Sequence, residues 1–211
     1  MKIRSSALIT LALAAVVVAV GLVMTFVGGG IRFYSQSAQM TQLDQMFWCM
    51  LAVVVLMFIF GFVRYDLPSG LALGTAALHD QLVTLAVTAI ASRAFAQSYV
   101  MPALVVASAV FTCAFTIPVI REARLIGRGL SLREHTRDEV ADMAVKKTRP
   151  VLIRVLAAAL LIFIAFAISG GGLMFGFALP LLAGILAAGL SAWRVSPYVW
   201  AAAASRSKTR R

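Results

Sequence analysis

Runs of about twenty apolar residues, separated by short polar stretches, limit most strongly what this chain can fold into. An α-helix rises about 1.5 Å per residue, so about 20 apolar residues cross the roughly 30 Å of hydrocarbon in a bilayer. Hydrophobic residues make up 62% of the 211 residues and charged residues 13%, whereas soluble domains are about 45–50% apolar and about 25% charged. The short alternating segments of a membrane β-barrel are absent from the sequence. The sequence therefore predicts an all-α, polytopic helical membrane protein.

We predict six transmembrane helices, over residues 7–27, 46–63, 71–91, 99–120, 151–169 and 174–193. The first run is longer than the apolar core of a signal peptide, which has about 7–15 residues. The best small-residue cleavage pattern after it, Ser35-Gln36-Ser37, is poor. We therefore expect the first run to remain as an uncleaved span.

The distribution of positive charge predicts the orientation of these helices. Nine of the 19 Lys and Arg residues lie in the polar interval 121–154. If all six runs span the membrane, 17 of the 19 fall on the side of the two termini, and only Arg32 and Arg93 fall on the other side. Because short loops rich in Lys and Arg face the cytoplasm, we predict a multi-pass protein of the cell inner (plasma) membrane with both termini cytoplasmic.

Four units follow from this topology. Residues 1–120 hold the first four membrane helices, 121–150 form a basic cytoplasmic loop with a helix, 151–193 form a membrane helical hairpin, and 194–211 form a basic cytoplasmic tail, disordered over 205–211. We attribute the net charge of +11 to orientation and to contact with anionic lipid headgroups, not to nucleic-acid binding. Other membrane proteins, or further copies of this chain, are the other expected partners.

The cytoplasmic unit is predicted to contain an amphipathic helix over about 131–148. Ser131 followed by Glu134 fits a capping box, and Pro150 is expected to end the helix just upstream. One face carries Val140, Met143, Ala144 and Lys147, which we expect to contact lipid or a partner protein. A second face carries acidic residues and a histidine, and we interpret it as a solvated charged face and not as a metal site.

The third apolar run contains the only acidic residue within any predicted span, Asp80, next to His79. Asp80, Thr84 and Thr88 recur every four residues and form one polar stripe near the middle of the bilayer. A central Asp costs about 2.5–3.5 kcal/mol on insertion scales, so it needs a partner inside the bundle. Three interpretations remain open: a proton or cation site tuned by His79, a hydrogen-bonded helix–helix contact, and a side chain in a water-filled cleft without further function.

The function is constrained mainly by what the sequence lacks. It contains no HExxH, GxSxG or P-loop motif, and no cofactor or metal motif. We therefore expect a non-catalytic integral inner-membrane subunit or scaffold of a larger envelope complex of secretion, conjugation or respiratory type. The alternative is a small-solute or proton-coupled transporter that uses His79 and Asp80. Small residues, namely Gly21, Gly74, Gly184, Ala188 and those at 157–159, are expected to permit close helix packing.

Overall fold

The fold of the protein was obtained as a computed structural model, which describes residues 2–26, 39–95, 101–129, 135–169 and 171–208. Every element in these ranges is a helix, which confirms the all-α prediction. In chain order the elements are α1 (Lys2–Phe26), α2 (Gln39–Arg64), α3 (Leu67–Phe95), α4 (Met101–Gly129), α5 (Arg137–Ser169), α6 (Gly171–Leu190), the π-helical turn η1 (Ser191–Val195) and α7 (Ser196–Lys208).

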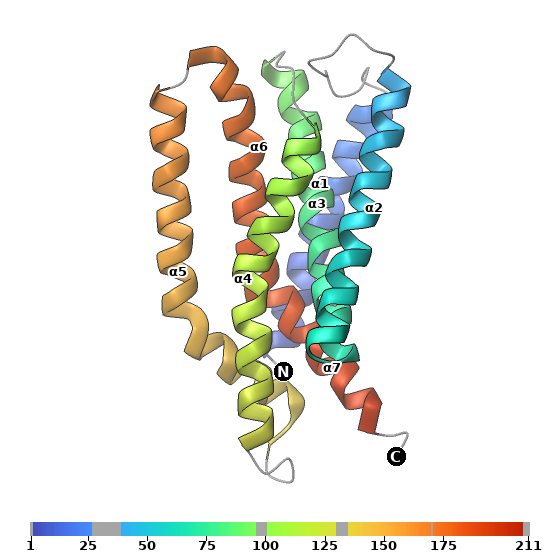
Figure 1. The fold of residues 1–211 in the computed structure, drawn as a ribbon, viewed down its shortest axis with the longest axis vertical. Helices are drawn as coiled ribbons and strands as arrows, with labels where there is room; N and C mark the ends of the chain where they lie inside the picture. Colours follow the sequence, from blue (N-terminus) through green and yellow to red (C-terminus); the bar gives the residue numbers. More distant parts are fainter. Residues whose placement is uncertain (1, 27–38, 96–100, 130–134, 170, 209–211) are drawn as a thin grey trace.

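The helices α1 to α6 run along the long axis of the molecule, and α3 occupies the centre (Figure 1). It packs against α1, α2, α4, α6 and α7. Within the described residues, four helices are long and apolar enough to cross a membrane, and they are α2, α3, α4 and α5. The described apolar part of α1, Ala7–Val23, is shorter. The number of six spans and their orientation remain predictions.

Glycines allow α3 to approach two of its neighbours closely. A Cβ atom on Gly21 of α1 would overlap the backbone of Ala86, and one on Gly61 of α2 would lie 2.8 Å from the Cα atom of Gly70. Gly74 and Gly184 also face other helices, with Phe58 and Thr84 as their nearest neighbours. The close packing expected at these glycines is therefore present.

The small residues at 157–159 behave differently. Ala157 and Ala158 are exposed on α5, and only Ala159 packs against a buried cluster. Residue size alone led to the prediction of close packing at this part of α5. Within this chain, that prediction is wrong for Ala157 and Ala158.

The turn between α2 and α3 joins three helices at one end of the bundle. The Asp66 carboxylate caps α3 by accepting hydrogen bonds from the backbone N–H and the hydroxyl of Ser69, at 3.0 and 2.6 Å. The Arg124 guanidinium of α4 donates to the other Asp66 oxygen at 2.8 Å and also contacts the carbonyl and the ring of Tyr65. One carboxylate therefore both starts α3 and holds α4 beside it.

Helix α5 corrects the predicted boundaries of the cytoplasmic helix. It is continuous from Arg137 to Ser169 with Pro150 inside it, so the helix predicted over 131–148 does not end before that proline. Its first turn is capped by Thr136 and Glu139, whose side chains each accept from the other's backbone N–H. The predicted capping pair, Ser131 and Glu134, lies outside the described residues. Figure 1 shows α5 bending between its lower and upper parts, as an internal proline favours.

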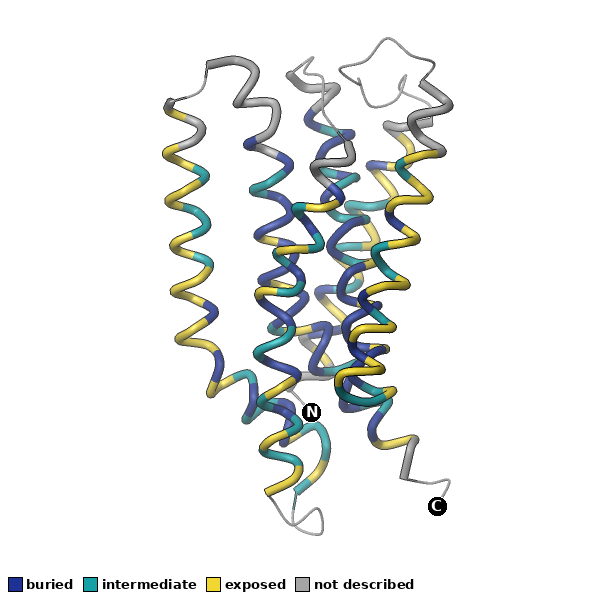
Figure 2. Tube along the Cα trace, in the orientation of Figure 1, coloured by how far each residue is buried: buried dark blue, intermediate teal, exposed yellow. Residues whose placement is uncertain are grey.

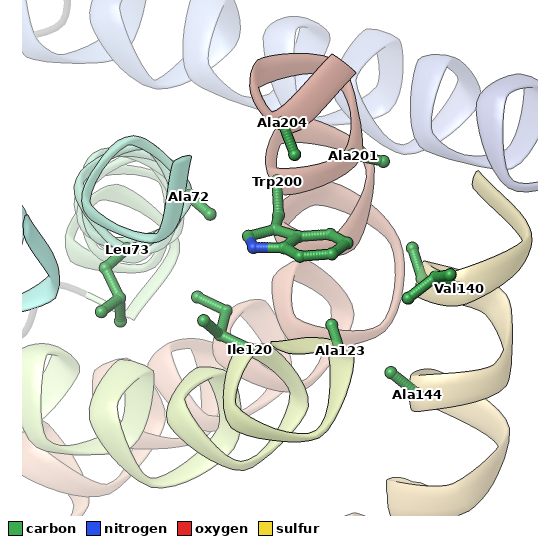
Figure 3. Close-up of a cluster of buried hydrophobic side chains, with 10 residues drawn as sticks. Ala72, Leu73, Ile120, Ala123, Val140, Ala144, Trp200, Ala201 and Ala204 are labelled. Carbon is green, nitrogen blue, oxygen red and sulfur yellow. The ribbon is translucent and has the colours of Figure 1, made fainter. Parts of the chain in front are cut away.

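Helix α7 corrects the predicted basic tail. Residues 196–208 are helical. The disorder predicted for 205–211 is therefore wrong for residues 205–208. Trp200, Ala201 and Ala204 are buried in a cluster with residues of α3, α4 and α5. Figure 3 shows the indole ring of Trp200 lying among Leu73, Ile120 and Val140, one from each of these helices. The C-terminal segment is therefore part of the core.

Exposed apolar side chains cover the outer helices, and Figure 2 shows this as long exposed stretches on α1, α2 and α5. The most exposed include Leu56 and Val63 on α2 and Ile162 and Ile168 on α5, at 64, 76, 70 and 81%. The central α3 is instead mostly buried. This inside-out distribution is the one expected when lipid is the solvent of the outer surface.

Candidate functional site, a buried carboxyl centre

The Asp80 side chain is completely buried at the centre of the bundle, where three polar groups surround it. Its Oδ2 atom accepts hydrogen bonds from the hydroxyls of Thr112 on α4 and Ser191 on η1, at 2.6 and 3.0 Å. Its Oδ1 atom lies 2.9 Å from Nδ1 of His79. When Asp80 is ionised, this last contact needs the proton on Nδ1, because a carboxylate only accepts hydrogen bonds. Three elements therefore meet at one carboxyl group.

Both hydroxyls that contact Asp80 also have a second acceptor in their own helix. The Thr112 hydroxyl lies 2.9 Å from the carbonyl oxygen of Ser108, and the Ser191 hydroxyl lies 3.1 Å from that of Ala188. A hydroxyl carries one rotatable proton and two lone pairs. Each can therefore donate to an ionised Asp80, or turn to its carbonyl and accept a proton from a neutral one. This arrangement satisfies both protonation states of the carboxyl group.

The backbone of η1 has a direct part in building this centre. In its π-helical turn the N–H of Ser196 bonds to the carbonyl oxygen of Ser191, five residues earlier. Such single turns are rare in helices and frequent at functional sites. Pro197 follows at once and has no N–H to continue a regular hydrogen-bond ladder. The proline therefore provides a local reason for the irregular turn that presents Ser191 to Asp80.

The polar stripe predicted on α3 is buried, but only part of it contacts the carboxyl group. Thr84 and Thr88 donate to the carbonyl oxygens of Asp80 and Thr84, each at 2.7 Å. Their hydroxyls are satisfied within α3, and the role proposed for them as an ion site or helix–helix glue stays a prediction. The adjacent His79 does reach Asp80, although successive residues on a helix point about 100° apart.

The partners of Asp80 on α4 and η1 were missed by sequence reasoning. Ser108, Thr112 and Thr116 recur every four residues on α4 and form a hydroxyl stripe of the same period as the one on α3. That periodicity was available as a signal for Thr112. Ser191 carried no such signal, because its neighbours are apolar and its approach depends on the π-helical turn.

The second predicted set, on the amphipathic part of α5, lies elsewhere in the molecule. Val140 and Ala144 are fully buried against α4 and α7, and Met143 packs against the same cluster. The expectation that this stripe faces lipid or a partner is therefore wrong for these three residues. Lys147 is exposed and pairs with Glu122 of α4, so it links two helices of this chain.

The buried centre has groups that are suited to proton and hydrogen-bond exchange. It contains one carboxyl group, one imidazole and two hydroxyls, without a second acid. Among the described residues no three His, Cys, Asp or Glu side chains gather as metal ligands. A general acid–base reaction on a substrate would also need an opening to the carboxyl group, and Asp80 is 0% exposed.

A bundle of helices with apolar outer faces is typical of polytopic membrane proteins. The chain belongs to the family described as "Protein export membrane protein SecD/SecF, C-terminal", whose model matches residues 30–206. No curated protein and no solved structure matches the chain. The family and the apolar helices together make this a multi-pass inner-membrane protein.

Proposed function

We propose that the chain is a non-catalytic integral membrane subunit of a protein-export complex. The observation that carries this proposal is the family match, which extends from residue 30 to residue 206 and so includes the described parts of α2 to α6 and most of α7. Of the three complex types expected from the sequence, the match favours secretion. The partners are other membrane proteins and the surrounding bilayer.

The outer surface offers room for such partners. The upper part of α5 exposes Leu161, Ile162 and Ile168 on more than one side, and only 11% of the 18-residue apolar window of α5 is buried. In a bilayer, lipid covers such a face as readily as protein does. Contact with another membrane protein therefore has to be distinguished from contact with lipid by experiment.

Site-specific photocrosslinking in intact membranes makes this distinction. A crosslinking residue replaces Ile162 on α5 or Leu56 on α2, and Leu13 on α1 serves as an equally exposed apolar control. We expect stoichiometric crosslinks to one or more membrane proteins from at least one of these helices, identified by mass spectrometry after gentle extraction. A protein that crosslinks only to lipid at all three sites, and purifies alone, contradicts the subunit proposal.

A second function, proton or cation coupling at Asp80, is supported by one specific observation. The two hydroxyls beside Asp80 each have an alternative acceptor, so they can bond to the carboxyl group both when it gains and when it loses a proton. His79 adds an imidazole, the side chain whose charge changes most readily near neutral pH. The carboxyl group is then a proton carrier inside the bundle.

The test of this second function is proton flux into liposomes that contain the purified protein, or the complex it is extracted with. The side chain of Asp80→Asn has nearly the same shape as that of Asp80, and like a neutral carboxyl group it offers an acceptor oxygen and a donor, but it cannot release a proton. We therefore expect normal folding and loss of flux. Glu139→Gln is the matched control, because Glu139 also contacts a histidine, His135, at 3.4 Å but on an exposed helix face. Equal flux in the wild type and Asp80→Asn contradicts proton coupling at this site.

A further inference from the structure

Two buried hydroxyls next to the Asp80 centre differ from the other buried hydroxyls of the described chain. The hydroxyls of Thr116 and Ser196 have no hydrogen-bond partner among the described residues, although both side chains are buried. Every other buried Ser or Thr side chain there has a partner, for example Thr148 and Ser108, which donate to carbonyl oxygens of their own helices. Leaving a buried hydroxyl unpaired costs about 1–3 kcal/mol, so these two require an explanation.

The layers above and below show that Thr116 and Ser196 share one level of the bundle. Above them, Thr112 and Ser191 converge on the same Asp80 oxygen. Below them, Leu73, Ile120 and Trp200 belong to one buried cluster (Figure 3). Thr116 lies one helical turn from both Thr112 and Ile120, and Ser196 lies between Ser191 and Trp200 along η1 and α7.

The third side of this level is formed by small side chains of α3. Ala76 and Ala77 lie between Leu73 and Asp80 along α3, and both are fully buried. Methyl groups fill little volume and offer no hydrogen bond. Two unpaired hydroxyls thus occur beside the small side chains of α3.

We propose that Thr116 and Ser196 bind one or more internal water molecules, in a closed polar chamber directly beside the Asp80 centre. A buried water makes about three hydrogen bonds to groups that are otherwise unsatisfied, and the hydroxyls of Thr116 and Ser196 are two such groups. The Leu73–Ile120–Trp200 layer separates the chamber from the end of the bundle that carries α7. The proposal does not depend on the proposed function, since it concerns the solvation of the bundle and not its partners.

The direct test is a structure of the wild-type full chain in nanodiscs, at a resolution at which ordered waters are visible. We expect density for at least one oxygen atom within hydrogen-bond distance of both the Thr116 and the Ser196 hydroxyls. A chamber without density there overturns the proposal. A peak whose occupancy follows the sodium concentration and raises Tm only in sodium identifies a cation, and it overturns the proposal as well.

Unfolding of matched variants provides an independent test. If one water bridges both hydroxyls, Thr116→Val and Ser196→Ala each lower Tm, and the double variant lowers it by less than the sum, because the bridge is lost only once. Thr148→Val and Ser108→Ala are the control pair, and their effects should add because no group is shared. A rise in Tm for both single variants at the chamber indicates dry, unpaired hydroxyls and contradicts the proposal.

Discussion

At the scale of single residues, the environment of Asp80 explains how a carboxyl group is accommodated in the middle of an apolar bundle. It is held by short contacts from one residue of its own helix and from two residues of other helices. Burying a polar group is costly unless its hydrogen bonds are made. The three polar groups around Asp80 therefore offset much of the desolvation that its position imposes.

The Thr112 hydroxyl is predicted to contribute to stability through Asp80. Thr112→Val preserves the shape of the side chain and leaves Asp80 Oδ2 with Ser191 as its remaining hydroxyl partner. We expect a loss of about 1–3 kcal/mol in the free energy of unfolding, measured by denaturant titration in detergent micelles. Thr88→Val is the control, because the Thr88 hydroxyl donates only to the Thr84 carbonyl oxygen. An equal loss in both variants contradicts a specific contribution from the Asp80 contact.

At the scale of elements, small residues decide which helices approach closely and prolines decide where they bend. α1 packs on α3 where Gly21 faces Ala86, and the absence of a Cβ lets the two backbones come together. Helix α5 passes through Pro150 without ending, because neighbouring groups and tertiary contacts compensate for one lost backbone bond. Packing between helices therefore outweighs the helix propensities of single residues here.

Substitution of Gly21 separates packing from helix propensity. Gly21→Ala adds a methyl group that overlaps the Ala86 backbone, and such overpacking destabilises by about 1–3 kcal/mol. Gly189→Ala is the matched control in α6, since its new Cβ meets no atom closer than 4.0 Å and alanine favours a helix by about 1 kcal/mol. We expect a lower Tm for the first variant and an unchanged or higher one for the second. The opposite order contradicts close α1–α3 packing.

At the scale of the whole molecule, several basic side chains and their partners lie at one end of the bundle. The α2–α3 turn, the lower part of α5 and α7 lie at the same end as the start of α1 (Figure 1). Arg124 is held there by Asp66, and Lys147 by Glu122. Arg137 lies over the ring of Trp200, 5.9 Å from its centroid. This end is also the one for which the charge distribution predicts a cytoplasmic location.

The contribution of α7 to the fold is testable by truncation. Trp200→Ala removes the largest side chain of a cluster shared by four helices, and we expect it to cost about 3–5 kcal/mol of unfolding free energy. Removal of residues 206–211 takes away only the end of α7 beyond the buried Ala204 and should leave Tm nearly unchanged. If Trp200→Ala is as stable as this truncation, α7 does not contribute to the core.

The orientation of the helices in the membrane is a second prediction for the whole molecule. In a chain without Cys49 and Cys113, single cysteines replace Arg93 and Arg128. We expect a membrane-impermeant maleimide on intact cells to label the cysteine at 93 and not the one at 128, which becomes reactive only after permeabilisation. Labelling of the cysteine at 128 in intact cells contradicts the predicted cytoplasmic termini.

The sequence by itself determined the class of this protein. Apolar runs of spanning length leave a helix as the way for each run to satisfy its own backbone hydrogen bonds in lipid. The first four runs overlap α1 to α4, although the helices extend beyond the runs, as α2 does back to Gln39 and α4 does on to Gly129. The sequence also identified Asp80, because an acidic residue in an apolar run can be recognised without knowing which residues pack against it. These features are local in the chain.

Only the tertiary structure decided which residues meet. The contact between Asp80 and Ser191 joins positions 111 residues apart, and no local pattern around Ser191 announces it. Val140 and Ala144 are buried together with Trp200 and its neighbours, so a stripe that the sequence predicts to contact lipid or a partner is covered instead by α7 of the same chain. Apolar periodicity shows that a face will be covered, whereas the identity of the covering element follows from packing between helices that are distant in sequence.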